Sequence, residues 1–168
     1  MLRCAPLPAL LVLAACGGGG GATAVPPTAV PLHLAADDLD LGPATTAAEL
    51  RVRLAGDAAA GAVLLEAKIE LPPALSLAPN DRLTALTPLT TLDGDLGAGS
   101  FHVVCGDARN PAAAQLATGP LFAVRLVTSK PRQAGTYTLR ITGLRAATKD
   151  GAPVAVEPAP TVVSVVVR

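Results

Sequence analysis

Few residues of this 168-residue sequence have side chains suited to catalysis. His102 follows Ser100 by two positions and precedes Asp107 by five, so a base, a hydroxyl and a carboxylate lie close in sequence. A hydrolytic triad uses these three groups, and a strand would place Ser100 and His102 on one face. Because no Gly-x-Ser-x-Gly turn presents the serine, we expect His102 to pack on a sheet surface and the chain not to be an enzyme.

Metal-binding patterns are equally sparse. His33 is the other histidine and has no paired spacing with His102, so the sequence predicts no zinc site. The segment Asp93-Gly94-Asp95 offers two carboxylates to calcium, and Asp107 and Asn110 would add oxygens if their loops converged. Since calcium takes about six to eight oxygens, we expect an ordinary polar turn at this segment and no bound metal cofactor.

Two other groups of polar residues are expected to be structural. Asp37, Asp38 and Asp40 form an acidic cluster of the kind found in solvated loops. Cys105 ends the strand-like run Phe101–Cys105, where a buried and unreactive thiol is the usual outcome.

Composition excludes further classes of function. Charged residues make up 15% of the chain, the formal net charge is zero and the arginines are scattered singly, so nucleic-acid binding is excluded. Aromatic residues make up 2%, namely Phe101, Phe122 and Tyr137. Both phenylalanines occupy apolar strand positions, which leaves Tyr137 as the one ring free to lie at the surface and stack on a sugar.

The N-terminus carries the most specific motif. Arg3 precedes the apolar run Ala5–Ala15, which is shorter than the roughly 20 residues of a membrane-spanning helix and typical of a secretory signal. The run ends in Leu13-Ala14-Ala15-Cys16, which resembles the lipobox of bacterial lipoproteins. The resemblance implies cleavage between Ala15 and Cys16 and attachment of a diacylglycerol to the Cys16 thiol.

The lipobox divides the chain into a signal peptide (1–15), a lipidated tether (16–30) and a domain (31–168). Five glycines follow Cys16 and a Pro-Pro pair comes soon after, so we expect a flexible spacer with an r.m.s. span of roughly 20 Å. Gly17 rather than aspartate follows the cysteine, which in Gram-negative lipoproteins implies the outer membrane. Cys105 would then be the single cysteine of the domain, without a disulfide partner.

Hydrophobic alternation predicts that the domain is all β. Apolar residues recur with period two, and the stretches from Val63 to Leu71 and from Tyr137 to Thr142 alternate most regularly. Together with Pro- and Gly-containing turns, this pattern predicts a two-sheet antiparallel sandwich. The expected strands are Leu50–Leu54, Val63–Leu71, Phe101–Cys105, Leu121–Thr128 (a central strand), Tyr137–Thr142 and Thr161–Val167.

Two local features complete the expected fold. Asp150-Gly151 is predicted to form a two-residue hairpin turn, because both residues tolerate positive φ. The segment Pro111–Leu116 is predicted to form one or two helical turns within a loop, since Pro111 suits a first helical position.

Several stretches resemble the cohesin-type domains of bacterial extracellular proteins, which are jelly-roll sandwiches. They are 61–77, 119–127, 134–141 and 149–156, in the family's order of strands and turns, and with 50–54 the similarity spans roughly residues 45–168. The family often has an aromatic-Asp pair before the turn proline, where this chain has Leu71-Pro72. No contact residue of the family is therefore carried over.

The sequence thus predicts an envelope-anchored lipoprotein whose domain binds another protein without catalysis. The alternative is a carbohydrate- or cell-wall-binding module, and a hydrolase that uses His102 is a third hypothesis. Exposure of Tyr137 distinguishes the first two hypotheses, and a concave site beside His102 would favour the third.

Cys16 provides the first test. The change Cys16→Ser should prevent acylation, because serine lacks the thiol that receives the lipid, and should leave either an uncleaved precursor or a soluble product. Intact-mass analysis of the wild-type protein checks this, since a Cys16 without acyl mass would contradict the lipoprotein hypothesis.

Overall fold

The computed structural model describes residues 29–57, 61–80, 82–89, 91–96, 99–106 and 115–168. Strands dominate, and the described residues include no helix long and apolar enough to cross a membrane. The strands are β1 (His33–Ala36), β2 (Leu39–Leu41), β3 (Ala47–Ala55), β4 (Leu64–Glu70), β5 (Leu75–Leu77), β6 (Leu83–Ala85), β7 (Thr91–Leu96), β8 (Ser100–Gly106), β9 (Gly119–Thr128), β10 (Gly135–Ala147) and β11 (Thr161–Val167).

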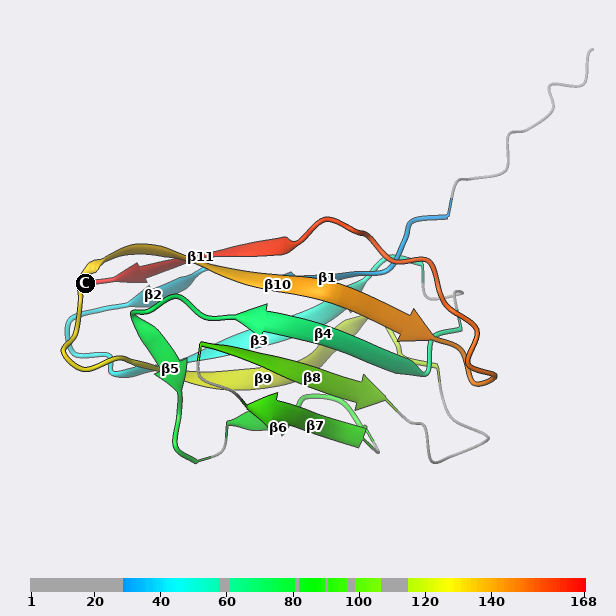
Figure 1. The fold of residues 1–168 in the computed structure, drawn as a ribbon, viewed down its shortest axis with the longest axis horizontal. Coiled ribbons are helices and arrows are strands. Elements are labelled where there is room, and N and C mark those ends of the chain that lie inside the picture. Colours follow the sequence, from blue (N-terminus) through cyan, green and yellow to red (C-terminus); the bar gives the residue numbers. More distant parts are fainter. Residues whose placement is uncertain (1–28, 58–60, 81, 90, 97–98, 107–114) are drawn as a thin grey trace, which may run out of the picture.

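The strands form two sheets packed face to face, which confirms the predicted sandwich (Figure 1). The six-stranded sheet has the order β2-β11-β10-β4-β8-β7. The five-stranded sheet has the order β1-β3-β9-β5, and β6 pairs with β9 on the same side as β5. Paired strands run antiparallel with one exception, since β2 pairs with β11 in parallel. The predicted antiparallel arrangement therefore holds everywhere but at this edge.

Alternation along each strand explains which side chains form the core. In β4, Leu65, Ala67 and Ile69 are buried, whereas the charged residues between them lie on the outer face. In β9, the run from Leu121 to Val124 is buried on both faces, as predicted for a central strand. Strands paired on both sides lose solvent access, so continuous apolar runs are stable there.

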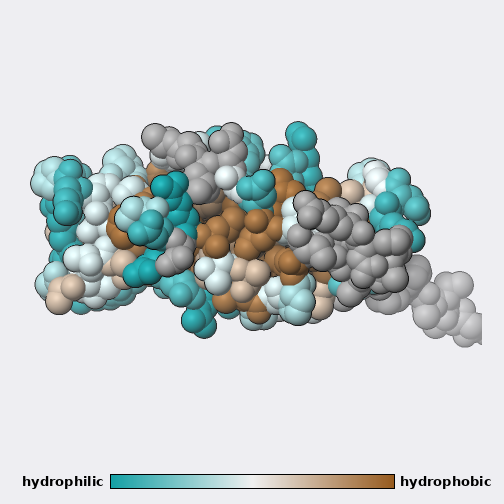
Figure 2. Space-filling model, turned by 90° about the horizontal axis from the view of Figure 1, so that it is seen from below, coloured by the Kyte–Doolittle hydropathy of each residue, from teal (hydrophilic) through white to brown (hydrophobic). Residues whose placement is uncertain are grey.

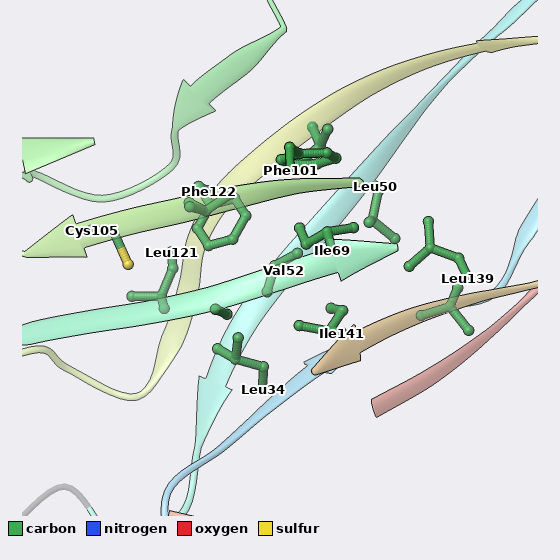
Figure 3. Packing of buried hydrophobic residues seen from close by; sticks show 14 of the residues in the cluster. Leu34, Leu50, Val52, Ile69, Phe101, Cys105, Leu121, Phe122, Leu139 and Ile141 are labelled. Carbon is green, nitrogen blue, oxygen red and sulfur yellow. The ribbon is translucent and has the colours of Figure 1, made fainter. Parts of the chain in front are cut away.

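The core between the sheets is entirely apolar among the described residues. Phe101 from β8 and Phe122 from β9 are the largest fully buried side chains, as their strand positions predicted. Figure 3 shows them packed with leucine, isoleucine and valine side chains that come from both sheets. Because no polar or charged described residue is buried, the inner faces of the sheets are held together by hydrophobic burial. Hydrogen bonds between the sheets, such as the one that the Thr161 hydroxyl donates to the Leu34 carbonyl, lie at the periphery.

One edge of the sandwich is closed by β1 and β2, where the three aspartates have structural partners. Asp37 makes two hydrogen bonds with Arg53, at 3.1 and 2.8 Å. Asp38 accepts a hydrogen bond from the Ser164 backbone N–H at 2.7 Å, and Asp40 forms a 2.8 Å ion pair with Arg168. All three carboxylates are exposed, as expected for a solvated segment, and their contacts also attach β1 and β2 to neighbouring strands.

Arg132 closes one end of the sandwich. Its guanidinium donates four hydrogen bonds of 2.7–2.9 Å to backbone carbonyls, those of Leu41, Gly42, Thr45 and Arg168. These carbonyls belong to the last residue of β2, to the segment between β2 and β3 and to the residue that follows β11. One side chain therefore connects three separate parts of the chain, and its planar group with five N–H donors suits this arrangement.

The opposite edge of the sandwich lies between β6 and β7, which belong to different sheets and do not pair with each other. Side chains cover the core at this edge. Figure 2 views this edge and shows apolar surface gathered at its centre. Leu83 from β6, Leu89 from the following loop and Leu92 from β7 pack partly buried against the core there. The segment Asp93-Gly94-Asp95 lies inside β7 and not in a turn, so that prediction was wrong. The exposed Asp93 belongs to an edge strand, where charge discourages pairing with another chain.

One predicted loop feature differs and another is not covered. The hairpin after β10 is closed by hydrogen bonds from Gly151 N–H to the Thr148 carbonyl and from Thr148 N–H to the Ala152 carbonyl. Its loop is therefore the three residues from 149 to 151, with Gly151 at φ 79°, and not a two-residue Asp150-Gly151 turn. The predicted helix at 111–116 lies largely outside the described residues.

Ile69 tests the assignment of the two faces of β4. We expect Ile69→Ala to lower the free energy of unfolding by about 2–5 kcal/mol, because a fully buried side chain is replaced by a cavity. The change Lys68→Ala on the outer face should stay within about 0.5 kcal/mol. Chemical denaturation measures both, and equal effects would contradict the assignment.

Arg132 gives a second stability prediction. Removing it in Arg132→Ala deprives four carbonyls of a charged donor, so we expect a loss of about 2–3 kcal/mol. Arg132→Lys should recover less than half of this loss, since one ammonium group cannot span four acceptors. Arg145→Ala, at an exposed position on β10, is the control, and a loss of equal size in this variant would refute the specific role of Arg132.

Candidate binding faces

The residues considered for hydrolysis do not assemble into a catalytic site within the described part of the chain. Ser100 and His102 share the outer face of β8, as predicted, but no hydrogen bond joins them. Glu66 Oε1 lies 3.9 Å from His102 Nδ1, and both side chains are about half exposed. Asp107 lies outside the described residues. His102 therefore lies on an open sheet surface, next to charged neighbours of β4.

The residues considered for metal binding are similarly dispersed. No group of three or more His, Cys, Asp or Glu side chains gathers among the described residues. His33 lies on β1 and His102 on β8, in different sheets. Asp93 Oδ1 accepts a 2.7 Å hydrogen bond from the Gly94 N–H, and Asn110 lies outside the described residues. Calcium binding at Asp93 and Asp95 stays an untested hypothesis.

Cys105 is fully buried in the core, which confirms its predicted structural role. Burial raises the pKa of its thiol from 9.0 to about 12, because the thiolate would lose its hydration in apolar surroundings. The thiol is therefore protonated and inert at neutral pH. Cys16, Ala15 and the rest of the lipobox lie outside the described residues.

The outer face of the six-stranded sheet carries charge of both signs and is called here the mixed-charge face. It spans β10, β4, β8 and β7. The register places Arg140 opposite Glu70 and Arg145 opposite Glu66. The further outward residues of this face are Lys68, Asp93, Ser100, His102, Val104, Thr138 and, on β11, Val162.

A β-bulge in β10 produces this arrangement. Residues five apart on a regular strand point to opposite faces, yet Arg140 and Arg145 are both exposed and both lie opposite a glutamate of β4. The register shifts between Thr142 and Arg145, where Gly143 adopts φ 62°. The extra residue shifts the alternation of inward and outward side chains by one position, so that Arg145 points outward and Ala146 inward.

The arginines of the mixed-charge face have no side-chain partners among the described residues. Lys68 pairs with Glu70 at 2.9 Å along β4, whereas neither Arg140 nor Arg145 makes a side-chain hydrogen bond or ion pair with the described residues. Val162 of β11 lies directly opposite Arg140 of β10 and is 59% exposed. Unpaired guanidinium groups beside an exposed valine form a surface suited to contact with a protein.

The outer face of the five-stranded sheet is different and is called here the arginine face. Arg51 and Arg53 project from β3, and Arg125 projects from β9 opposite Glu49. Arg125 N–H donates to the Arg82 carbonyl, which brings a fourth exposed arginine to this face.

Two hollows follow one another along the arginine face. One of about 320 Å³ is lined by Glu49, Arg125 and small residues that include Ala123 and Thr84. The other, of about 300 Å³, is lined by Arg51 and Arg53 together with Asp37, Leu86 and Pro120. Both are open depressions, because short side chains on β9 and β6 alternate with long arginines.

Aromatic side chains contribute little to either face. Tyr137 is half-buried against the core, and its hydroxyl donates a 3.2 Å hydrogen bond to the Gln133 carbonyl. The expectation that this ring is free at the surface was therefore wrong. With Phe101 and Phe122 buried, the described residues offer no aromatic platform for a sugar.

Comparison with known proteins identifies the fold. No protein-family model and no curated protein matches the sequence. The sixth cohesin of scaffoldin B from Acetivibrio cellulolyticus, solved in complex with a dockerin, is similar over 82% of this chain and 99% of that chain, with a TM-score of 0.65 and 12% identity. The domain has the cohesin fold.

Other cohesins give the same result. A type I cohesin of Clostridium thermocellum, in complex with a dockerin, is similar over 84% of this chain and 97% of that chain, with a TM-score of 0.64 and 10% identity. A non-cellulosomal cohesin of the archaeon Archaeoglobus fulgidus has a TM-score of 0.60 and 14% identity over 81% of this chain and 91% of that chain. The predicted cohesin-like architecture is thereby confirmed.

Cys105 yields a pH prediction. Unfolding lets its thiol ionise at the ordinary pKa of 9.0, so the unfolded state is stabilised above pH 9 and the free energy of unfolding falls as pH rises from 9 to about 12. Cys105→Ala should remove this part of the pH dependence, as measured by denaturation of both proteins across that range. Parallel pH profiles for the two proteins would contradict the raised pKa.

Proposed function

We propose that this protein is a bacterial lipoprotein, anchored through Cys16, whose cohesin-like domain binds a protein partner without catalysis. The anchor keeps the domain at the cell envelope, on the outer membrane. The tether lets the domain turn toward its partner. No bound cofactor other than the lipid on Cys16 is required, because binding of this kind needs only a complementary surface.

The observation that carries the proposal is the mixed-charge face. Arg140 and Arg145 extend from it without partners in the part of the chain that the structure describes, and Val162 adds exposed apolar area. A partner with carboxylates at matching positions would make charge-assisted hydrogen bonds to both arginines. The similar cohesins of A. cellulolyticus and C. thermocellum were solved with dockerins, and similarity over nearly their whole length supports a complete binding module in this chain.

Binding through the mixed-charge face is testable with paired variants. The mature protein, immobilised, should retain a partner from envelope extract, and the double change Arg140→Glu and Arg145→Glu should abolish retention by repelling the partner's carboxylates. Truncating a charged contact at the centre of an interface typically weakens binding by about 2–4 kcal/mol, or roughly 30- to 1000-fold.

The matched control is Arg51→Glu with Arg53→Glu, which makes the same charge change on the opposite face. Loss of the partner in the control alone, or in neither variant, would refute the assignment to the mixed-charge face. Retention of purified cell-wall polysaccharide in place of a protein would favour the carbohydrate-binding alternative.

A further inference from the structure

The arginine face concentrates positive charge on a chain that is neutral overall. Among the described side chains of this face, Arg51, Arg53, Arg82 and Arg125 accompany two carboxylates, those of Glu49 and Asp37, which leaves an excess of two positive charges. The mixed-charge face balances three cations against three carboxylates over its described side chains, Lys68, Arg140 and Arg145 against Glu66, Glu70 and Asp93. The two faces point in opposite directions because they are the outer surfaces of one sandwich.

One cation of this face, Arg125, is open to an external anion, while Arg51 and Arg53 form exposed ion pairs with Glu49 and Asp37. Arg125 makes no side-chain hydrogen bond or ion pair with the described residues, although it lies directly opposite Glu49. Glu49 pairs instead with Arg51 at 2.8 Å, and the two side chains are 48% and 71% exposed. Exposed pairs of this kind contribute little stability, so they yield readily to a competing anion.

The chemistry of the face suits phosphate. Every described cation on it is an arginine, and arginine binds phosphate through two parallel N–H donors where lysine offers a point charge. The second hollow is large enough to admit a phosphate group between Arg51 and Arg53, and the first is large enough to admit one beside Arg125. Leu86, 36% exposed, lines the second hollow and adds apolar contact at its margin.

The connection to the proposed anchor selects among the possible sources of phosphate. The chain enters the domain through β1, which belongs to the five-stranded sheet, and 12 residues separate Cys16 from Ala29. A glycine-rich tether of that length has an r.m.s. span of about 20 Å, so lipid headgroups lie within reach of this sheet. The tether raises the effective concentration of headgroups near the domain, so weak contacts between arginine and a headgroup suffice for docking.

We propose that the arginine face docks the tethered domain onto anionic phospholipid headgroups and so turns the mixed-charge face away from the membrane. The inference rests on the anchoring part of the proposed function. Each arginine near an anionic surface favours the docked state about fivefold. Docking then presents the opposite face to a protein partner, and raised ionic strength releases it.

Fluorescent labels on the two faces test the docking. Ser76→Cys places a thiol on the exposed side of β5, on the arginine face but outside both hollows, and Thr138→Cys places one on the mixed-charge face. Cys105 is buried and protonated, so it stays unlabelled. The labelled mature lipoprotein is reconstituted into phosphatidylcholine vesicles with or without phosphatidylglycerol, and a nitroxide on the lipid headgroup quenches a nearby label.

We expect quenching of the Ser76 label to increase with phosphatidylglycerol and to fall with salt, while the Thr138 label stays unquenched. Arg125→Gln should lower the docked-to-free ratio about fivefold. Arg140→Gln on the other face is the matched control and should leave the ratio unchanged.

Three outcomes would overturn the inference. Quenching that is equal for both labels, or insensitive to Arg125→Gln, means that this face does not dock. An Arg125-dependent response to soluble polyglutamate without any response to vesicles means that the occupant is an acidic peptide. A protein that fails to float with plain phosphatidylcholine vesicles lacks the anchor, which refutes the anchoring proposal itself and the docking with it.

Discussion

The alternation of side chains along a strand is the constraint on which the whole molecule depends. With three aromatic residues in the chain, the core must be filled by aliphatic side chains that point inward at every second position of both sheets. The same alternation sends the remaining side chains outward, so two polar faces arise wherever a dry core does. The two faces proposed to bind are therefore formed by the outward-pointing half of the alternating residues, and neither depends on a separate cleft.

Polar contacts at the periphery fix the positions of the strand ends, which the core does not determine. Hydrophobic burial is not directional, so it holds two sheets together without fixing their ends. Hydrogen bonds are directional. Arg132 fixes one end of the sandwich by donating to four carbonyls, and Asp38 fixes the β2–β11 edge by accepting from the Ser164 N–H of β11. The described part of the domain holds one buried, unpaired cysteine, so its ends are fixed by hydrogen bonds and not by a disulfide.

The fold was largely predictable from the sequence, because long strands display enough alternation to be recognised. The core positions in β4, β8 and β9 follow directly from it. The short strands β1, β2, β5 and β6 span three or four residues each, too few for a period to emerge. In β7, Asp93 and Gly94 are typical of turns, yet pairing with β8 keeps them extended. Local preference yields there to contacts distant in sequence.

The two faces were harder to foresee, since they depend on register. Arg51, Arg53 and Arg125 are separate in sequence and meet only because β3 pairs with β9 in one alignment. Similarly, Arg140 and Arg145 would point to opposite sides without the bulge at Gly143. The acidic residues at 37, 38 and 40 could not be assigned partners in advance, because those partners lie on β3 and at the C-terminal strand.

The bulge in β10 also determines where a one-residue deletion is tolerated in this strand. Gly143 and Leu144 together oppose a single residue of β4, so this strand already contains one surplus residue. Loss of one codon at this point would restore regular pairing and leave Arg145 outward and Ala146 inward. The same deletion anywhere else in β10 would exchange the inward and outward residues that follow it. The bulge is thus the one place in this strand where evolution can shorten the protein without inverting its surface.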